Sequence, residues 1–160
     1  MPITTEVTGL METQRKLEQV VADLQGAPML NAMREATLMV QATAKEEAPV
    51  DTGRLRASIT PEVRGGPDEV IGAVGSNVDY APYMELGTGT FAGKSAHFPP
   101  PAALDVWARR HGAPSGFVVA RAIFMRGGLK PRRFLQIGFE KNEGRIKAKI
   151  EGAVSEIVQK

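Results

Sequence analysis

Apolar residues recur at helical spacing along the first third of the chain. Residues 10–25 place five of them on one face of a predicted helix: Leu10, Leu17, Val20, Val21 and Leu24. Gly26 then interrupts the pattern, and Pro28 suits the first turn of a second helix. This second helix is predicted to continue to Ala48, because the residue before a proline, here Pro49, resists helical geometry.

Alternation of apolar and polar residues replaces the helical period in residues 55–63, which predicts a half-buried strand. The apolar positions of this predicted strand are Leu55, Ala57, Ile59 and Val63. The sequence RGGPD at 64–68 predicts a turn, and residues 69–76 predict a second strand. The two strands form a predicted β-hairpin, which is weak alone, so we expect it to pack on the long helix.

The middle of the chain has no sustained period. Residues 77–100 predict irregular structure with one helical turn at 81–87, and residues 87–100 form a long loop. Long loops in compact domains are usually functional or become ordered against a partner. Two short helices are then predicted: 102–112, and 115–128, which Ser115 caps and Gly127 ends.

The C-terminal part predicts a closing element and a helix. The sequence FLQIGF at 134–139 is compatible with a strand or a helical turn. An apolar stripe then predicts a C-terminal helix: Ile146, Ile150, Ala153, Val154 and Ile157. This order predicts an α+β fold, a small antiparallel β-sheet backed by a long N-terminal helix and a C-terminal helix. We expect a single domain over residues 1–160, with a helical extension at 1–27 and a loop and short-helix insertion at 87–130.

Composition changes the picture little. The chain has 42% hydrophobic and 24% charged residues, a net charge of +2 and no cysteine, which excludes disulfides and thiolate chemistry. Residues 121–149 hold nine basic side chains against two acidic ones, so a nucleic-acid-binding module stays open as an alternative function. We find no signal-peptide pattern and no apolar run of membrane-spanning length, and we expect a cytoplasmic protein without a membrane partner.

The triplet Asp51-Thr52-Gly53 is the one that carries the catalytic aspartate in aspartic proteases. Such a site needs two carboxylates that share a proton. Here Arg54 and Arg56 follow the triplet, and two guanidiniums would hold Asp51 ionised. We therefore interpret the triplet as a corner between two elements, with Asp51 as a turn-forming residue and Gly53 at a positive φ. An Asp51-dependent protease remains the less favoured alternative.

Other chemistry has little support in the sequence. His97 and His111 are the only histidines, and neither has the spacing of a metal-binding motif. The segment GTGTFAGKS at 87–95 lacks the glycine–lysine spacing of a phosphate-binding loop. No serine lies in a nucleophile-elbow context. We expect no catalytic residue, metal, cofactor or small-molecule substrate.

Three stretches resemble, in order, the signature blocks of the gene-product-ten-like tail-component family of long-tailed bacteriophages: APVDTGRLRASI, VGSNVDYAPYMELGTG and KPRRFLQIGFEKN. The segment between the second and third blocks is similar to an insertion seen in a subgroup. The resemblance runs from about residue 28 to the C-terminus. The matching positions are Pro49, Asp51, Thr52, Gly53 and Leu55 in the first block, and Tyr80, Ala81, Tyr83, Glu85, Gly87 and Thr88 in the second. Arg133, Phe134 and Leu135 match the third block, with Arg133 standing where a proline is usual.

The resemblance implies a structural virion protein of the phage neck or tail, assembled in the host cytoplasm. It further implies a homo-oligomeric ring, commonly a hexamer, that joins tail to head and contacts neighbouring neck or tail proteins. We expect the loop 87–100 and its surroundings to reach a neighbour, with Phe91, His97, Phe98 and Trp107 as interface residues. The basic residues near the C-terminus would face an acidic ring or packaged DNA. Tail terminator, tail-completion factor and minor tail component stay open as roles.

Overall fold

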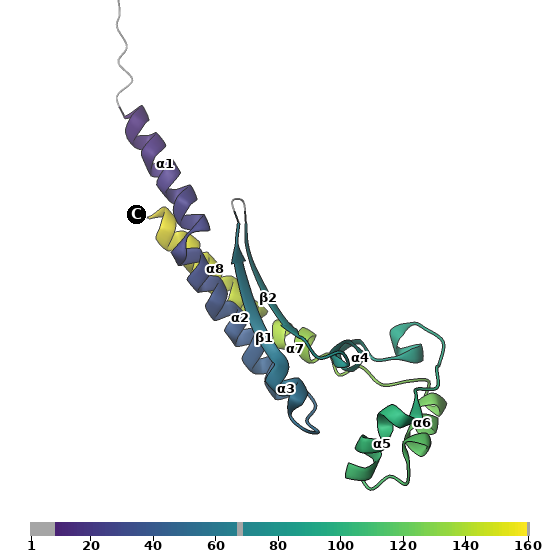
Figure 1. Cartoon of the computed structure of the whole chain (residues 1–160). Coiled ribbons are helices and arrows are strands. Elements are labelled where there is room, and N and C mark those ends of the chain that lie inside the picture. Colours follow the sequence, from purple (N-terminus) through teal and green to yellow (C-terminus); the bar gives the residue numbers. More distant parts are fainter. Residues whose placement is uncertain (1–8, 67–68, 160) are drawn as a thin grey trace, which may run out of the picture.

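The computed structural model describes residues 9–66 and 69–159, which form an elongated body and a projecting arm (Figure 1). The body contains α1 (Leu10–Gln25), α2 (Ala27–Glu47), α3 (Arg54–Ser58), β1 (Ile59–Gly65), β2 (Val70–Ser76), α7 (Phe134–Glu140) and α8 (Glu143–Val158). The arm contains α5 (Pro101–Arg110) and α6 (Gly116–Met125), reached through α4 (Ala81–Leu86) and the 3-10 turn η1 (Gly89–Ala92). The predicted α+β class is thus confirmed.

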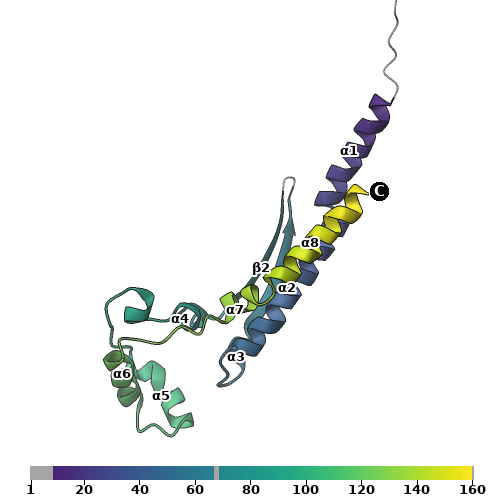
Figure 2. The same cartoon turned by 180° about the vertical axis from the view of Figure 1, so that it is seen from behind.

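Helices α1 and α2 have the predicted bounds to within a residue. Gly26 is extended, with φ −94° and ψ −163°, so it separates the two helices. In Figures 1 and 2 α1 continues beyond the end of the hairpin. None of the α1 residues is buried. Its predicted apolar face exists, but the side chains of Leu10, Met11, Leu17 and Val21 are 52–72% exposed.

Helix α2 is the central element of the body. It contacts both strands, α7 and α8, and Figure 2 shows α8 lying along it. Its buried face consists of Met29, Ala32, Ala36, Thr37, Val40 and Ala44. Most of these side chains are small, which allows the neighbouring elements to approach the helix closely.

The predicted hairpin is present and packs on α2. Its strands are antiparallel, with Ile59 opposite Ser76 and Gly65 opposite Val70. The approach is close at Gly72, where a Cβ atom would lie 2.7 Å from the Met33 sulfur. The predicted turn at 64–68 includes two residues, 67 and 68, that lie outside the described part of the chain.

The expected start of the first strand at Leu55 is wrong. Residues 54–58 form the short helix α3, and the strand begins at Ile59. Leu55 and Ile59 are both buried and lie four residues apart, a spacing that suits a helical turn as well as a strand. The spacing alone therefore does not separate the two alternatives, and the structure places both side chains in the core by one helical turn.

The closing element is a helix rather than a strand, which resolves the alternative that the sequence leaves open. In α7, Gly138 lies directly on α2, and a Cβ atom there would be 3.0 Å from the Ala44 Cβ. The buried Asn142 follows α7, and its amide donates to the Thr43 hydroxyl at 2.8 Å and to the Gly138 carbonyl at 2.8 Å. These contacts fix the corner between α7 and α8 against α2.

The core of the body collects buried residues from four separate segments of the sequence. Its buried members are Ala44, Ala48, Leu55, Ile59, Val78, Ala81 and Phe134. Phe134 and Ile59 are fully buried and are among the largest side chains in the described interior. The core thus joins the end of α2, the start of the hairpin, α4 and α7.

Within residues 9–66 and 69–159, none of the helices is both long enough and apolar enough to span a bilayer.

Candidate functional site

The corner between α2 and α3 has the predicted backbone geometry at Gly53. At Asp51 it also makes a contact that the sequence did not predict. Gly53 has the predicted positive φ, +80°, a backbone conformation that only glycine adopts without strain. Thr52 accepts a hydrogen bond from the Arg54 amide at 3.4 Å. Pro49 is half-buried and ends α2, and Leu55 enters the core.

The carboxylate of Asp51 contacts the arm. One oxygen lies 2.9 Å from Arg110 Nη1, and the other lies 3.7 Å from His111 Nε2. Its side chain faces a guanidinium, whereas a protease dyad requires a second carboxyl group. Asp51 therefore links the corner of the body to the end of α5.

Glu85 connects the second and third sequence blocks. Its two carboxylate oxygens accept hydrogen bonds from the amides of Leu135 and Gln136, each at 2.9 Å. These amides belong to the first turn of α7, where N–H groups have no partner within the helix and a negative charge is favourable. The residue acts as the cap of a helix fifty positions further along the chain.

Arg133 precedes α7 in the left-handed region, with φ +50°. A proline cannot adopt this φ, because its ring fixes φ near −65°. The backbone before α7 therefore differs from the one that a proline at this position would give. Next to it, Phe134 is buried in the core and Leu135 is half-buried.

The other residues of the second block line the route to the arm. Tyr80 and Tyr83 are exposed, whereas Ala81, Gly87 and Thr88 are buried. The Thr88 amide donates to the Leu129 carbonyl at 2.9 Å, and the Thr88 hydroxyl accepts from the Leu129 amide at 2.9 Å. The two segments that enter and leave the arm are thus bonded to each other.

At two of its glycines, this paired connection leaves no space for a side chain. A Cβ atom on Gly89 would lie 2.0 Å from the Gly127 carbonyl oxygen, and one on Gly128 would lie 2.1 Å from the Thr88 carbonyl oxygen. The Thr90 amide donates to the Gly127 carbonyl at 2.8 Å. Together with the contact between Asp51 and Arg110, this connection holds the arm, which we define as residues 87–133.

The arm exposes an aromatic patch, defined here as Phe98, Phe117, Val118, Phe124 and Met125. These side chains are 42–72% exposed. The Phe98 ring lies 5.6 Å from that of Phe117 and 6.0 Å from that of Phe124. The opposite side of α6 is occupied, because Gly116 and Ala120 are buried and the Gly116 amide donates to Asp105 at 2.8 Å.

The predicted interface residues lie on the arm, but in different settings. Phe91 and Phe98 are each 42% exposed, and His97 is exposed. Trp107 is 40% exposed and stacks on His111, with ring centroids 4.0 Å apart. Phe98 alone of these joins the aromatic patch. Sequence reasoning missed the α6 members, although a helix with apolar residues on both faces could have indicated them.

The body contains an apolar groove along α2. Two adjoining hollows of about 360 and 190 Å³ meet at Met33. The floor is formed by α2, one wall by Val70, Gly72 and Val74 of β2, and the other by Leu135, Phe139, Ile146 and Ile150 of α7 and α8. Val21 and Leu24 of α1 border its upper end. Phe139 and Val21 remain 51% and 52% exposed, so the groove opens to solvent.

Charge is divided sharply between the arm and the remainder. Residues 87–133 carry eight basic side chains and one acidic one, Asp105, a net charge of +7. The remainder of the chain carries twelve basic and seventeen acidic side chains, a net charge of −5. Within the described residues, Arg110 is the only arginine or lysine of the arm that forms an ion pair. The overall charge of +2 conceals this division.

No metal-binding cluster of three or more His, Asp or Glu side chains occurs among the residues that the structure describes. The features that stand out are therefore surfaces: the aromatic patch, the groove and the charges around each. Exposed apolar and charged surfaces of this kind are typical of sites that bind macromolecules.

Comparison with known families gives one match. Residues 12–87 match a family model described as "Bacteriophage HK97-gp10, putative tail-component". The matched segment includes the first sequence block and all but the last two residues of the second, and it ends at Gly87, where the arm begins. Comparisons with curated proteins and with solved structures find no match. Over residues 12–87 the resemblance inferred from the sequence is thus confirmed: this part of the chain is similar to the HK97-gp10-like family of bacteriophage tail components.

Proposed function

We propose that the protein is a structural subunit of the phage head–tail junction, which assembles into a homo-oligomeric ring and joins the tail to the head. The observation that carries the proposal is the family match of residues 12–87 to a phage tail component. The role is mechanical, so the protein has no substrate. The ion pair of Asp51 with Arg110 supports this, because it occupies the one carboxylate for which a catalytic role was considered.

Ring formation is supported by the distribution of exposed apolar surface. The chain offers an aromatic patch on the arm and an apolar groove on the body, which are two different surfaces. A ring with heterologous contacts needs two different, complementary patches on each subunit. Six copies is the number expected from the family resemblance, and neighbouring neck or tail proteins would occupy the faces of the ring.

The head–tail role is tested by removing the protein from phage particles. A phage that lacks the gene is expected to produce filled heads and complete tails that remain unjoined in electron micrographs. Supplying the protein in trans restores joined particles. Normal particles without the protein would exclude a junction role, and filled heads with no tails at all would assign it to tail construction.

One observation favours a second candidate function, contact with nucleic acid. Arg121, Arg126, Lys130, Arg132 and Arg133 lie in the arm without an ion pair among the described residues, and unpaired cations of this kind bind phosphates. Binding of DNA fragments by the purified chain, weakening steeply as salt rises, is the expected sign of this function. The exposed aromatic patch among the same cations is not explained by phosphate contact.

A further inference from the structure

The aromatic patch is an unpartnered helix face. In α6 the exposed positions Phe117, Val118, Phe124 and Met125 recur at helical spacing, with Arg121 between them. Phe98 packs over this face and extends it. A soluble helix usually turns such a stripe toward a core, whereas here the buried side is the other one, with Gly116 and Ala120. The patch therefore has the character of an interface core.

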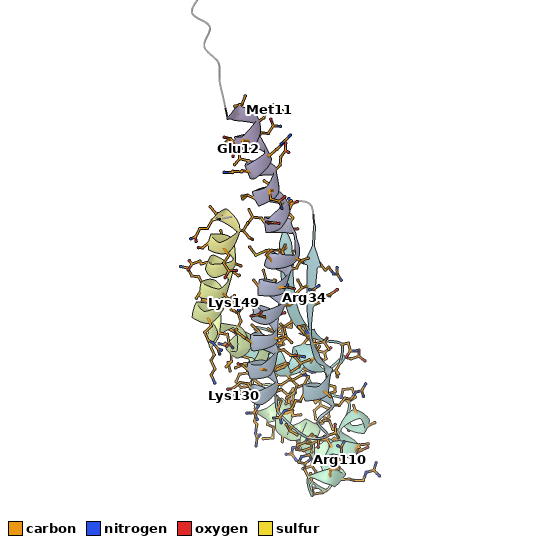
Figure 3. The ribbon with its side chains drawn as sticks, turned by 90° about the vertical axis from the view of Figure 1, so that its left-hand side faces the viewer. Met11, Glu12, Arg34, Arg110, Lys130 and Lys149 are labelled. Carbon is orange, nitrogen blue, oxygen red and sulfur yellow. The ribbon has the colours of Figure 1, made fainter. Side chains whose placement is uncertain are left out.

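The groove on α2 is apolar and lies far from the patch within one chain. Figures 1 and 2 show that α6 lies in the projecting arm, away from α1, α2 and α8. Figure 3 places Arg110 of α5 at one end of the molecule and Met11 of α1 at the other. The paired connection and the Asp51 contact hold the arm in this position. The patch and the groove of one chain thus do not meet.

The net charges of the arm and of the remaining chain indicate which partner suits the groove. The arm has a net charge of +7 and the remainder of the chain −5, so opposite charges approach each other when an arm meets the body of another copy. Helix α1 also exposes an apolar stripe, but it belongs to the acidic part and lacks this complementarity. The arm is therefore the better-matched occupant.

We propose that the α6 aromatic patch of one copy docks in the α2 groove of the next copy, so that subunits associate head to tail. The inference rests on the proposed ring function and specifies its interface. Phe117 and Phe124 act as apolar anchors on Met33 and Phe139, and arm cations steer the approach to the acidic body. Because the patch and the groove are different surfaces, a dimer joined in this way still has one free patch and one free groove, to which further copies can bind.

DNA is a weaker match for the same surface. Phosphate contacts require cations alone, and they leave the apolar side chains of α6 exposed to water. A groove with apolar walls removes those side chains from water, while the acidic remainder still neutralises the cations. A second copy therefore accounts for both properties of the arm, and DNA for one.

Two variants test the docking. The arm variant carries Phe117→Asp and Met125→Asp, at positions 55% and 72% exposed. The groove variant carries Val21→Lys and Phe139→Lys, at positions 52% and 51% exposed. Substitution at such exposed positions leaves the fold largely intact, which circular dichroism and thermal melting verify. As a matched control, Ile71→Lys changes an equally exposed residue, 50%, that does not line the groove.

Sedimentation velocity of the full chains gives the readout. Each variant alone is expected to self-associate at least about tenfold more weakly than the unchanged chain, whereas Ile71→Lys associates normally. An equal mixture of the two variants is expected to form a one-to-one dimer and nothing larger. The groove variant contributes an intact arm to that dimer, and the arm variant contributes an intact groove.

Three outcomes overturn the proposal. They are a mixture that stays monomeric, a variant that assembles as well as the unchanged chain, and an unchanged chain that stays monomeric at every concentration. Loss of DNA binding by the arm variant, with self-association intact, assigns the patch to nucleic acid instead. The phage gene-deletion experiment reports the junction role separately, so either proposal can fail while the other stands.

Discussion

At the scale of single residues, the sequence blocks converge because a few side chains reach across long stretches of chain. Glu85 caps α7, and Asp51 binds Arg110 of the arm. The sequence identifies Glu85 and Asp51 as important positions. Their partners lie 50 and 59 residues away, and no local pattern connects positions so far apart. Arg110 was therefore missed, and Asp51 was interpreted from its neighbours only.

We expect Glu85→Ala to lower the free energy of unfolding by about 1–2 kcal/mol, because two amides in the first turn of α7 lose their acceptor. Glu85→Gln keeps one acceptor oxygen and should cost less. Glu62→Ala is the control, since among the residues that the structure describes this exposed carboxylate pairs only with the nearby Arg64. Urea unfolding measures all three, and a Glu85→Ala variant as stable as the unchanged chain would disprove the capping role.

The contact between Asp51 and Arg110 is partly exposed, so its contribution is small. A double-mutant cycle of Asp51→Ala and Arg110→Ala is expected to give a coupling free energy of about 0.2–1 kcal/mol by urea unfolding, decreasing at high salt. Arg109→Ala in place of Arg110→Ala serves as control, because Arg109 does not pair with Asp51. Equal coupling with Arg109 would show that the ion pair is not the cause.

At the scale of elements, hydrophobic periodicity and the glycine, proline and capping residues at element ends were enough to predict the long helices, the second strand, α4, α5 and α6. The start of the first strand could not, because Leu55 and Ile59 suit both a strand and a helical turn and the core decides between them. The closing segment 134–139 was ambiguous for a similar reason. Its cap, Glu85, lies in another element, so the signal that makes α7 a helix is not local.

Close packing of α7 on α2 predicts opposite effects at two helical glycines. Gly138→Val should lower the free energy of unfolding by about 1–3 kcal/mol, since a Cβ atom there would already lie 3.0 Å from Ala44 Cβ and the Val40 carbonyl oxygen. Gly152→Ala in α8 has open space and should raise it by about 0.5–1 kcal/mol. Denaturant unfolding distinguishes them, and a neutral Gly138→Val would show that the two helices pack loosely.

At the scale of the whole molecule, the chain divides into an acidic body and a basic arm that holds an exposed aromatic patch. The sequence contains this division, because residues 87–133 have a single acidic side chain, but a count over 121–149 obscured it by mixing arm and body. The groove could not be predicted, since its floor and walls come from α2, β2, α7 and α8. Two complementary surfaces on one elongated chain are what a ring of identical subunits requires.

The most direct test of ring assembly is the mass of the intact protein across a concentration series, measured by light scattering with negative-stain images of the same samples. Head-to-tail association through two different surfaces predicts closed rings of one subunit number, which become more abundant as concentration rises. A stable twofold dimer that does not grow further would contradict it, because such a dimer pairs one surface with itself and leaves no complementary surfaces to close a ring.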